Sequence, residues 1–357
     1  MIRALTEHDL SAVADLYQRI VRGGGPPPEW LAPYFRQTVL DHPWYDSDLP
    51  SLVHEESDGS LSAFIGVHVR RLQFEGRPIR LACSGQLVAD PVVGGASGLM
   101  LMRAFLSGPQ DISITDGATP AARAMWTRLG GKVRELESIS WVAVLRPVRA
   151  GAGLLASRAP LIPVRSGGGR LVRALDTRWR HLIQRSAAGA PRSTPLDTET
   201  LVSVLPTLTS ERRLAPTYDE RFARWLLWTL EQSVARGELR VRLVSNRKAR
   251  PAGLFVYYRL AGGCSQVICL VGRPDSLGTV IGALFADALQ GGASSIAGRL
   301  EPQVADALAG RRFVLRHTGE ALVHARDAEL GRSILAGDAW LTRLEGEYWM
   351  AHHLERP

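Results

Sequence analysis

A glycine-rich loop directly before an apolar helix carries the clearest chemical signal in the sequence. In the stretch 81–106 a predicted strand leads into a loop with Gly94, Gly95 and Gly98, and a helix is expected to begin at once. The loop amides and the first N–H groups of such a helix have no partner inside the helix, so they can point together at one anion. The pattern predicts a phosphate site after Asp90. The alternative is a tight turn into a helix that binds nothing.

The two common nucleotide-binding motifs do not fit this loop. A P-loop requires G-x-x-x-x-G-K-[ST], and the chain has lysine only at Lys132 and Lys248. A Rossmann fingerprint requires G-x-G-x-x-G inside a βαβ unit, whereas three predicted strands precede this loop, with hairpin turns at Asp58-Gly59 and Glu75-Gly76. The phosphate site therefore belongs to another kind of fold.

Carboxylates are the second set of candidates, because a positioned carboxylate can take a proton from an amine. Asp116 follows the predicted strand 112–115 and is a candidate base, although it could also only cap the helix after Thr119. The meander residues Glu55, Glu56 and His68 are weaker candidates, since the sequence does not fix the face to which they point.

A stretch near the C-terminus, 337–350, is dense in aromatic and acidic residues. If it forms a hairpin that turns at Glu345-Gly346, one face would present Asp338, with Trp340 and Thr342, to an acceptor groove. Asp338 is then the second catalytic candidate. The alternative is that the tryptophans complete a core while the acids are surface charges.

The elements that must position these residues occur in two similar series. Residues 1–147 predict a helix, an antiparallel meander of three strands, the loop and its helix, and then a strand, a helix and a closing strand 133–144. Residues 196–357 repeat this order without the glycine-rich loop. The segment 148–195 is the predicted connector. Ten arginines and one acid lie between Arg146 and Arg192, and an amphipathic helix there could meet an acidic partner or dock on a neighbouring domain.

This order of elements resembles the GNAT acyltransferase superfamily. The family's R-G-x-G-x-G/A loop is similar to 93–98, with Val93 at the Arg/Gln position and Ala96 at the middle glycine. The resemblance implies that this loop holds the pyrophosphate of acetyl-CoA or another acyl-CoA, and that strand amides at Leu87 and Val88 stabilise the oxyanion. Trp126 occupies the place of a tyrosine that can protonate the leaving thiolate, which an indole cannot do. The residues implied to bind the cofactor are Leu87, Val88, Val93, Gly94, Gly95, Ala96, Ser97 and Gly98.

The sequence thus predicts a mixed α/β protein with two tandem acyl-CoA N-acyltransferase-like domains, an arrangement that also resembles the Fem-type aminoacyltransferases. The expected reaction moves an acyl group from CoA to an amine, such as an amino sugar, an amino acid or a small amine. A catalytically silent binding module is the first alternative. Aminoacyl transfer from tRNA is the second, but no aromatic platform is interleaved with the arginines of the connector.

Composition and charge limit the class of protein to which the chain can belong. The chain has 357 residues, 45% apolar and 22% charged, which is typical of a globular protein of two domains. The basic residues behind the net charge of +8 are almost all arginines, and this charge does not by itself indicate nucleic-acid binding. No apolar run is long enough to span a membrane, so we expect a cytoplasmic protein. Three scattered cysteines predict no disulfide framework and no metal site. The sequence does not decide between a monomer and a homodimer.

Overall fold

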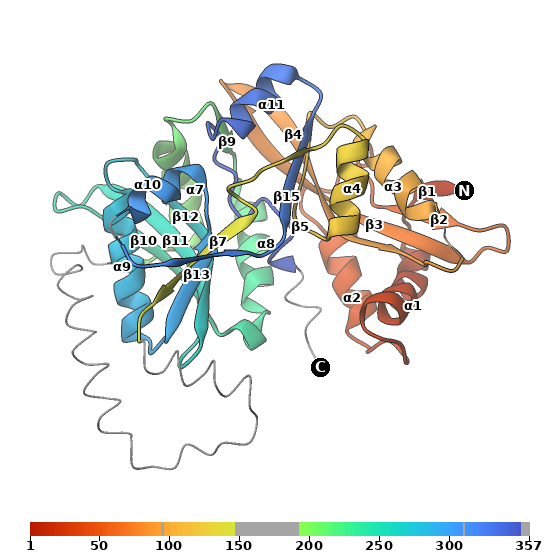
Figure 1. Ribbon diagram of the computed structural model, residues 1–357, viewed down its shortest axis with the longest axis horizontal. Helices are drawn as coiled ribbons and strands as arrows, with labels where there is room; N and C mark the ends of the chain where they lie inside the picture. The colour runs from red at the N-terminus through yellow and green to blue at the C-terminus, as the bar shows by residue number, and fades with distance from the viewer. Residues whose placement is uncertain (94–95, 147–192, 310, 351–357) are drawn as a thin grey trace, which may run out of the picture. The chain divides into compact units, whose positions relative to one another are not determined.

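The computed structural model describes residues 1–93, 96–146, 193–309 and 311–350 (Figure 1). Gly94, Gly95 and nearly all of the predicted connector lie outside these residues. The described chain is a mixed α/β protein of two compact units, each built on one mixed sheet, as the sequence predicts.

The first unit comprises residues 1–135, 212–228 and those from 319 onward. Its main sheet has the order β1-β2-β3-β4-β5-β15-β6, and β9 pairs with β3. The strands are β1 (Ile2–Ala4), β2 (Leu52–Glu55), β3 (Leu61–Phe74), β4 (Arg77–Ala89), β5 (Ile112–Ala118), β6 (Lys132–Val133), β9 (Leu214–Pro216) and β15 (Glu320–Ala325). The helices are α1 (Leu10–Val21), α2 (Leu31–Phe35), α3 (Ser97–Leu106), α4 (Pro120–Arg128), α11 (Ala328–Leu335) and most of α8 (Glu220–Glu231), with helical turns at Glu7–Asp9 and Arg36–Leu40.

Local chemistry explains where these elements begin and end. The helix α4 has Pro120 at its first position, and the Thr119 hydroxyl accepts a hydrogen bond from the Ala122 amide. The long hairpin of β3 and β4 turns at Glu75 and Gly76, both with positive φ (51° and 81°), as a tight type I′-like turn requires.

Helices cover both faces of the first sheet. Helices α1 and α2 pack on the face that carries Phe64 and Val88. Helices α3 and α4 pack on the opposite face, which carries Ala63 and Ile65. Since adjacent residues of a strand point to opposite faces, the alternation along β3 explains this division.

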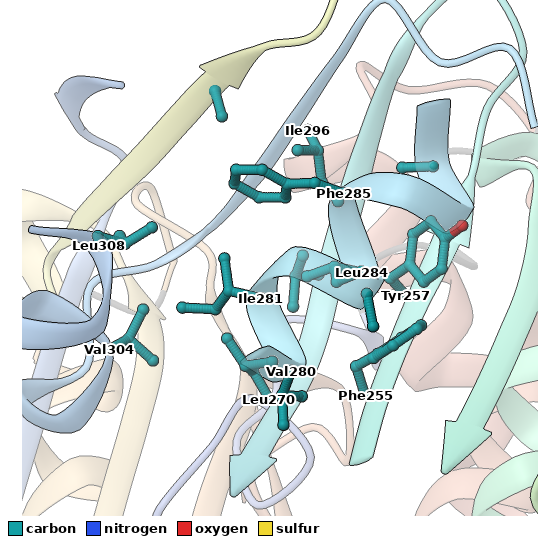
Figure 2. Close-up of a cluster of buried hydrophobic side chains, with 14 of the residues drawn as sticks. Phe255, Tyr257, Leu270, Val280, Ile281, Leu284, Phe285, Ile296, Val304 and Leu308 are labelled. Carbon is teal, nitrogen blue, oxygen red and sulfur yellow. The ribbon is translucent and has the colours of Figure 1, made fainter. Parts of the chain in front are cut away.

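The second unit comprises residues 136–211 and 229–318. Its sheet has the order β14-β7-β13-β12-β11-β10-β8, and α9 supplies much of its core, packing on Phe255 and Leu270 (Figure 2). The strands are β7 (Ile139–Val144), β8 (Ser193–Pro195), β10 (Glu238–Ser245), β11 (Pro251–Arg259), β12 (Cys264–Gly272), β13 (Ser295–Arg299) and β14 (Val314–His317). The helices are α7 (Thr198–Thr209), α9 (Leu277–Gln290) and α10 (Pro302–Leu308), with a helical turn at Val234–Arg236.

The two halves of the sequence exchange equivalent strands. The first sheet runs β3-β4-β5-β15-β6 and the second runs β11-β12-β13-β7-β14, so the penultimate strand of each series comes from the other half of the sequence. In Figure 1 the blue β15 lies beside the yellow β5, and the two pair antiparallel. The repeat of element order predicted from sequence is therefore present.

The exchange makes the units differ from the predicted boundaries at 147/148 and 195/196. The predicted closing strand 133–144 divides into β6 in the first sheet and β7 in the second, with residues 134–138 between them. Residues 337–350 belong to the first unit and contain turns rather than a hairpin. Among the described residues, no helix has the length and apolarity needed to cross a membrane.

Candidate active site

The separation of two parallel strands defines the candidate site. Strands β4 and β5 pair at three positions, which end with Cys83 opposite Ile114. Beyond them β4 continues to Ala89 and β5 to Ala118 without pairing to each other. The backbone groups of these strand ends lie outside the β4–β5 ladder, and on β5 the amides of Asp116 and Gly117 donate instead to a carboxylate described below.

A β-bulge in β4 lies directly beyond this point. Phe64 pairs with Val88 and Gly66 with Gly85, so Gln86 and Leu87 stand opposite the single residue Ile65. Gln86 has a φ of 36°, a conformation uncommon for a residue with a side chain. Such a bulge leaves a backbone group outside the ladder and turns it elsewhere, which is what an oxyanion donor at Leu87 or Val88 would need.

The start of α3 provides a partial anion site. Within the described residues, no hydrogen bond takes up the backbone amides of Ser97 and Gly98, and the buried Ser97 hydroxyl is also without a partner. The amides of Val92 and Val93, in contrast, donate to the Asp90 carboxylate at 2.9 and 3.2 Å, which holds its pKa low. Among the described residues of the predicted loop, Ser97 and Gly98 at the helix start thus keep their donors free.

A reciprocal pair of carboxylates occupies the end of β5. The Asp116 carboxylate accepts hydrogen bonds from the amides of Glu347 and Tyr348 at 2.8 and 2.9 Å. In return, the Glu347 carboxylate accepts from the amides of Asp116 and Gly117 at 3.2 and 3.3 Å. These four bonds fasten residues 347 and 348 to the unpaired end of β5.

The Glu347 carboxylate has two further donors, the Thr115 hydroxyl and the Cys83 thiol, whose sulfur lies 3.2 Å from Oε2. It therefore meets β4 and β5 where they separate. Enclosure of this carboxylate, reinforced by the nearby charge of Asp116, raises the pKa of Glu347 to about 8. Burial and the same acids raise the pKa of the Cys83 thiol well above its usual value, so that thiol stays protonated.

Gly346 allows this arrangement. A Cβ added at Gly346 would lie 2.2 Å from the Asp116 carboxyl carbon, closer than atoms can approach. The backbone therefore reaches the carboxylate only because residue 346 has no side chain.

Comparisons with solved structures identify the fold. A conserved protein of unknown function from Enterococcus faecalis V583, described as a probable N-acyltransferase, matches over 91% of this chain and 72% of its own, with 10% identity and a TM-score of 0.57. A GCN5-related N-acetyltransferase from Anabaena variabilis matches over 92% and 73%, with 9% identity and a TM-score of 0.56. An N-myristoyltransferase from Saccharomyces cerevisiae, solved with myristoyl-CoA and inhibitors, matches over 91% and 80%, with 10% identity and a TM-score of 0.50.

The chain has the GNAT fold. No protein-family model and no curated protein matches its sequence. The resemblance predicted from the loop and the order of elements is thus confirmed at the level of fold, over about nine-tenths of the chain. The Fem-type arrangement stays a prediction.

On this GNAT fold the two predicted catalytic acids have different surroundings. Asp116 lies in the clamp with Glu347. The Asp338 carboxylate instead accepts from the Arg213 amide at 3.4 Å and lies 4.0 Å from an Arg212 nitrogen, beside the start of β9. A role for Asp338 in the reaction stays a prediction, and we assign it no step.

Other predicted residues serve the core or the surface. Trp126 is fully buried between α3 and α4, with its ring against Phe105, and so completes the core. Val93 is exposed at the position of the family's Arg or Gln. Glu55 pairs with Arg3 rather than facing the site. The tryptophans of 337–350 are buried, as the core alternative predicted. The same alternative expected the acids to be surface charges, but Glu345 is buried too.

Proposed function

We propose that this protein transfers an acyl group from acyl-CoA to an amine. The observation that carries the proposal is the end of the β4–β5 pairing, beyond which β4 has its bulge at Gln86 and Leu87 and the Glu347 carboxylate contacts both strands. The acyl thioester would lie beside these strand ends, with its carbonyl oxygen held by a β4 amide at Leu87 or Val88.

The donors at the start of α3 suit the diphosphate of CoA. The amides of Ser97 and Gly98 and the Ser97 hydroxyl supply hydrogen bonds to an anion, and the helix dipole favours negative charge there. Gly94, Gly95 and Ala96 would add backbone donors as the sequence predicts. The charge of Asp90 would oppose the diphosphate, but Arg19 lies 3.0 Å from that carboxylate and offsets it.

Glu347 is our candidate for the general base. Its ionised carboxylate takes a proton from the attacking amine, whose nitrogen forms a bond to the thioester carbonyl carbon as the C–S bond breaks. The CoA thiolate that leaves must gain one proton. A carboxyl group with a pKa near 8 can return the proton that it received, because its acidity is close to that of a thiol. Glu347 then replaces the acid that Trp126 cannot supply, while Asp116 positions it.

Calorimetric titration with acetyl-CoA and a longer acyl-CoA tests the first half of this proposal. We expect at least one of these two acyl-CoA ligands to bind. Ser97→Ala should weaken that binding about 3- to 15-fold, which is the usual contribution of one hydrogen bond. Ser107→Ala, at the exposed C-terminal end of the same helix, is the control and should bind as the unchanged chain does. If the unchanged chain binds no acyl-CoA, the proposal is wrong.

Release of CoA thiol in the presence of an amine tests the second half. We expect Glu347→Gln to lower kcat at least 100-fold while leaving the affinity for acyl-CoA within about threefold, because the carboxylate acts in proton transfer. A variant that loses affinity and rate together would assign Glu347 to binding instead.

A catalytically silent binding module is the second candidate. Two observations favour it: Asp90 occupies the amides of Val92 and Val93, and Trp126 is part of the core. Binding of acyl-CoA without thiol release, over a panel of amines and amino sugars, would decide for this alternative.

A further inference from the structure

A buried arginine with two free donors lies on the same sheet face as the site. Arg70 is 1% exposed, and its Nη1 donates to His42 Nε2 at 2.9 Å and to the Val69 carbonyl at 3.0 Å. Within the described residues its Nε and Nη2 have no hydrogen-bond partner. These two nitrogens form the edge of a guanidinium that binds both oxygens of one carboxylate. The free donors are thus the matched pair for a planar anion.

The charge of Arg70 is also left without a bonded counter-ion. No salt bridge joins its nitrogens to a carboxylate of the described residues within 4.0 Å, and Glu345 and Asp116 act on it only at longer range. The Phe222 ring lies 5.4 Å from the guanidinium carbon. Glu345 is buried nearby, but its carboxylate already accepts from the Tyr218 hydroxyl and from the amide and hydroxyl of Thr342. A buried cation in this state is costly, and an anionic ligand would lower the cost.

A buried histidine lies one strand repeat away. His68 stands two residues before Arg70 on β3, so both side chains share a face, at Cα positions about 6 to 7 Å apart. His68 Nδ1 lies 3.1 Å from the Thr38 carbonyl, and the ring also has a side-chain hydrogen bond with Gln86. The His68 ring is therefore held on both of its sides.

The Glu347 carboxylate lies on this same sheet face. His68 pairs with Cys83 across the ladder, and the Cys83 thiol donates to Glu347. A Cβ added at Gly85 would lie 2.7 Å from His68 Nε2 and 3.8 Å from the Cβ of Glu347. The candidate base and the free edge of Arg70 therefore lie on one face of the sheet.

We propose that the acceptor of this enzyme is a primary amine that also carries a carboxylate, with the carboxylate on the Nε and Nη2 edge of Arg70 and the amine beside the Glu347 carboxylate. This inference rests on the proposed acyl transfer and narrows its acceptor. The amine, held beside Glu347, loses a proton to that carboxylate as it forms the amide bond, and the CoA thiolate gains a proton. The carboxylate of the acceptor is unchanged and serves only to bind.

Matched acceptors provide the test without any mutation. Amino acids of increasing chain length are compared with their own amides, which keep the amine and lose the negative charge, and thiol release from acetyl-CoA is measured. We expect kcat/KM for the preferred amino acid to exceed that for its amide at least tenfold, because a hydrogen-bonded charge contributes about 1.5–3 kcal/mol. Equal kcat/KM for acid and amide at every length would overturn the inference while leaving acyl transfer intact.

Arg70→Gln and Arg71→Gln form the matched pair of variants. Arg71 is the next residue on β3, with a side chain on the other face that is 61% exposed. We expect Arg70→Gln to reduce the preference for the acid about 10- to 100-fold without changing kcat/KM for the amide, and Arg71→Gln to change neither. A loss that is equal for acid and amide would make Arg70 a structural residue and refute the assignment.

Direct binding keeps the inference testable if no acyl transfer is found. In calorimetric titrations without acyl-CoA, the amino acid should bind more tightly than its amide, and Arg70→Gln should remove the difference. Absence of acyl-CoA binding together with this preference would refute the proposed function and retain the carboxylate site. Binding of the acid no tighter than the amide would refute the site.

Discussion

Replacement of Glu347 by glutamine should change how the stability of the protein depends on pH. The folded chain holds the proton of Glu347 up to a pKa of about 8, against an ordinary value of 4.5 for a free glutamate. Between these values the folded state binds more protons than the unfolded state, so stability falls as the pH rises. Glutamine has no proton to lose and removes this dependence.

The structure sets the size of the effect. Each pKa unit corresponds to about 1.4 kcal/mol, so the free energy of unfolding would fall by up to about 4 kcal/mol from pH 5 to pH 9. Glu347 is partly exposed as a residue, and solvent screening reduces this figure to about 1–3 kcal/mol. The quantity to measure is the difference in free energy of unfolding between the unchanged chain and Glu347→Gln. This difference cancels the titration of His42 and His68, whose pKa values are lowered.

Urea unfolding followed by tryptophan fluorescence at pH 5, 7 and 9 gives this difference. The exposed Glu29→Gln serves as the control and should track the unchanged chain at every pH. A difference between Glu347→Gln and the unchanged chain that stays constant over this range would refute our account of the clamp, because it would mean that Glu347 titrates alike in both states.

Three further changes test the same region. Gly346→Ala should destabilise the protein by about 1–3 kcal/mol, because its Cβ would overlap the carboxylate of Asp116, whereas Gly278→Ala, which meets nothing within 4 Å, should not; unfolding midpoints compare them, and equal values would contradict the clash. If Glu347 is the base, kcat/KM for acyl transfer should rise with pH to a plateau above about pH 8, and a flat profile from pH 6 to 9 would contradict this. Trp44→Ala should cost about 3–5 kcal/mol, because its ring is buried and stacks on another aromatic ring at 3.7 Å; a loss under 1 kcal/mol would show that the stack matters little.

Much of the fold follows from local patterns. Leu10, Val13 and Leu16 have the spacing typical of a helix and lie in α1, and the turn signal at Glu75-Gly76 matches the β3–β4 hairpin. The element order that residues 196–357 repeat includes the helix found as α9. The exchange of β7 and β15 could not be predicted in this way, because a strand carries in its sequence an alternation of polar and apolar residues but no mark of which sheet it joins.

The candidate site shows the same limit. Asp116 was identified because it ends a predicted strand. Glu347 was not, since it lies about 230 positions further along the chain and only the fold brings the two together. The sequence Glu345-Gly346-Glu347 did offer a signal, a glycine between two acids in an aromatic-rich stretch. Arg70 lies within a predicted strand, and its burial is decided by packing from α8 and by residues after 337.

The place of β15 in the first sheet bears on how the chain matures during its synthesis. Strand β5 stays an open edge until residues 320–325 have left the ribosome, and β7 must wait in turn for β13. Neither half can close its own sheet as it emerges, so each exposes an unpaired edge for most of translation. A fragment cut after residue 147 would lack β15, keep that edge permanently and should aggregate.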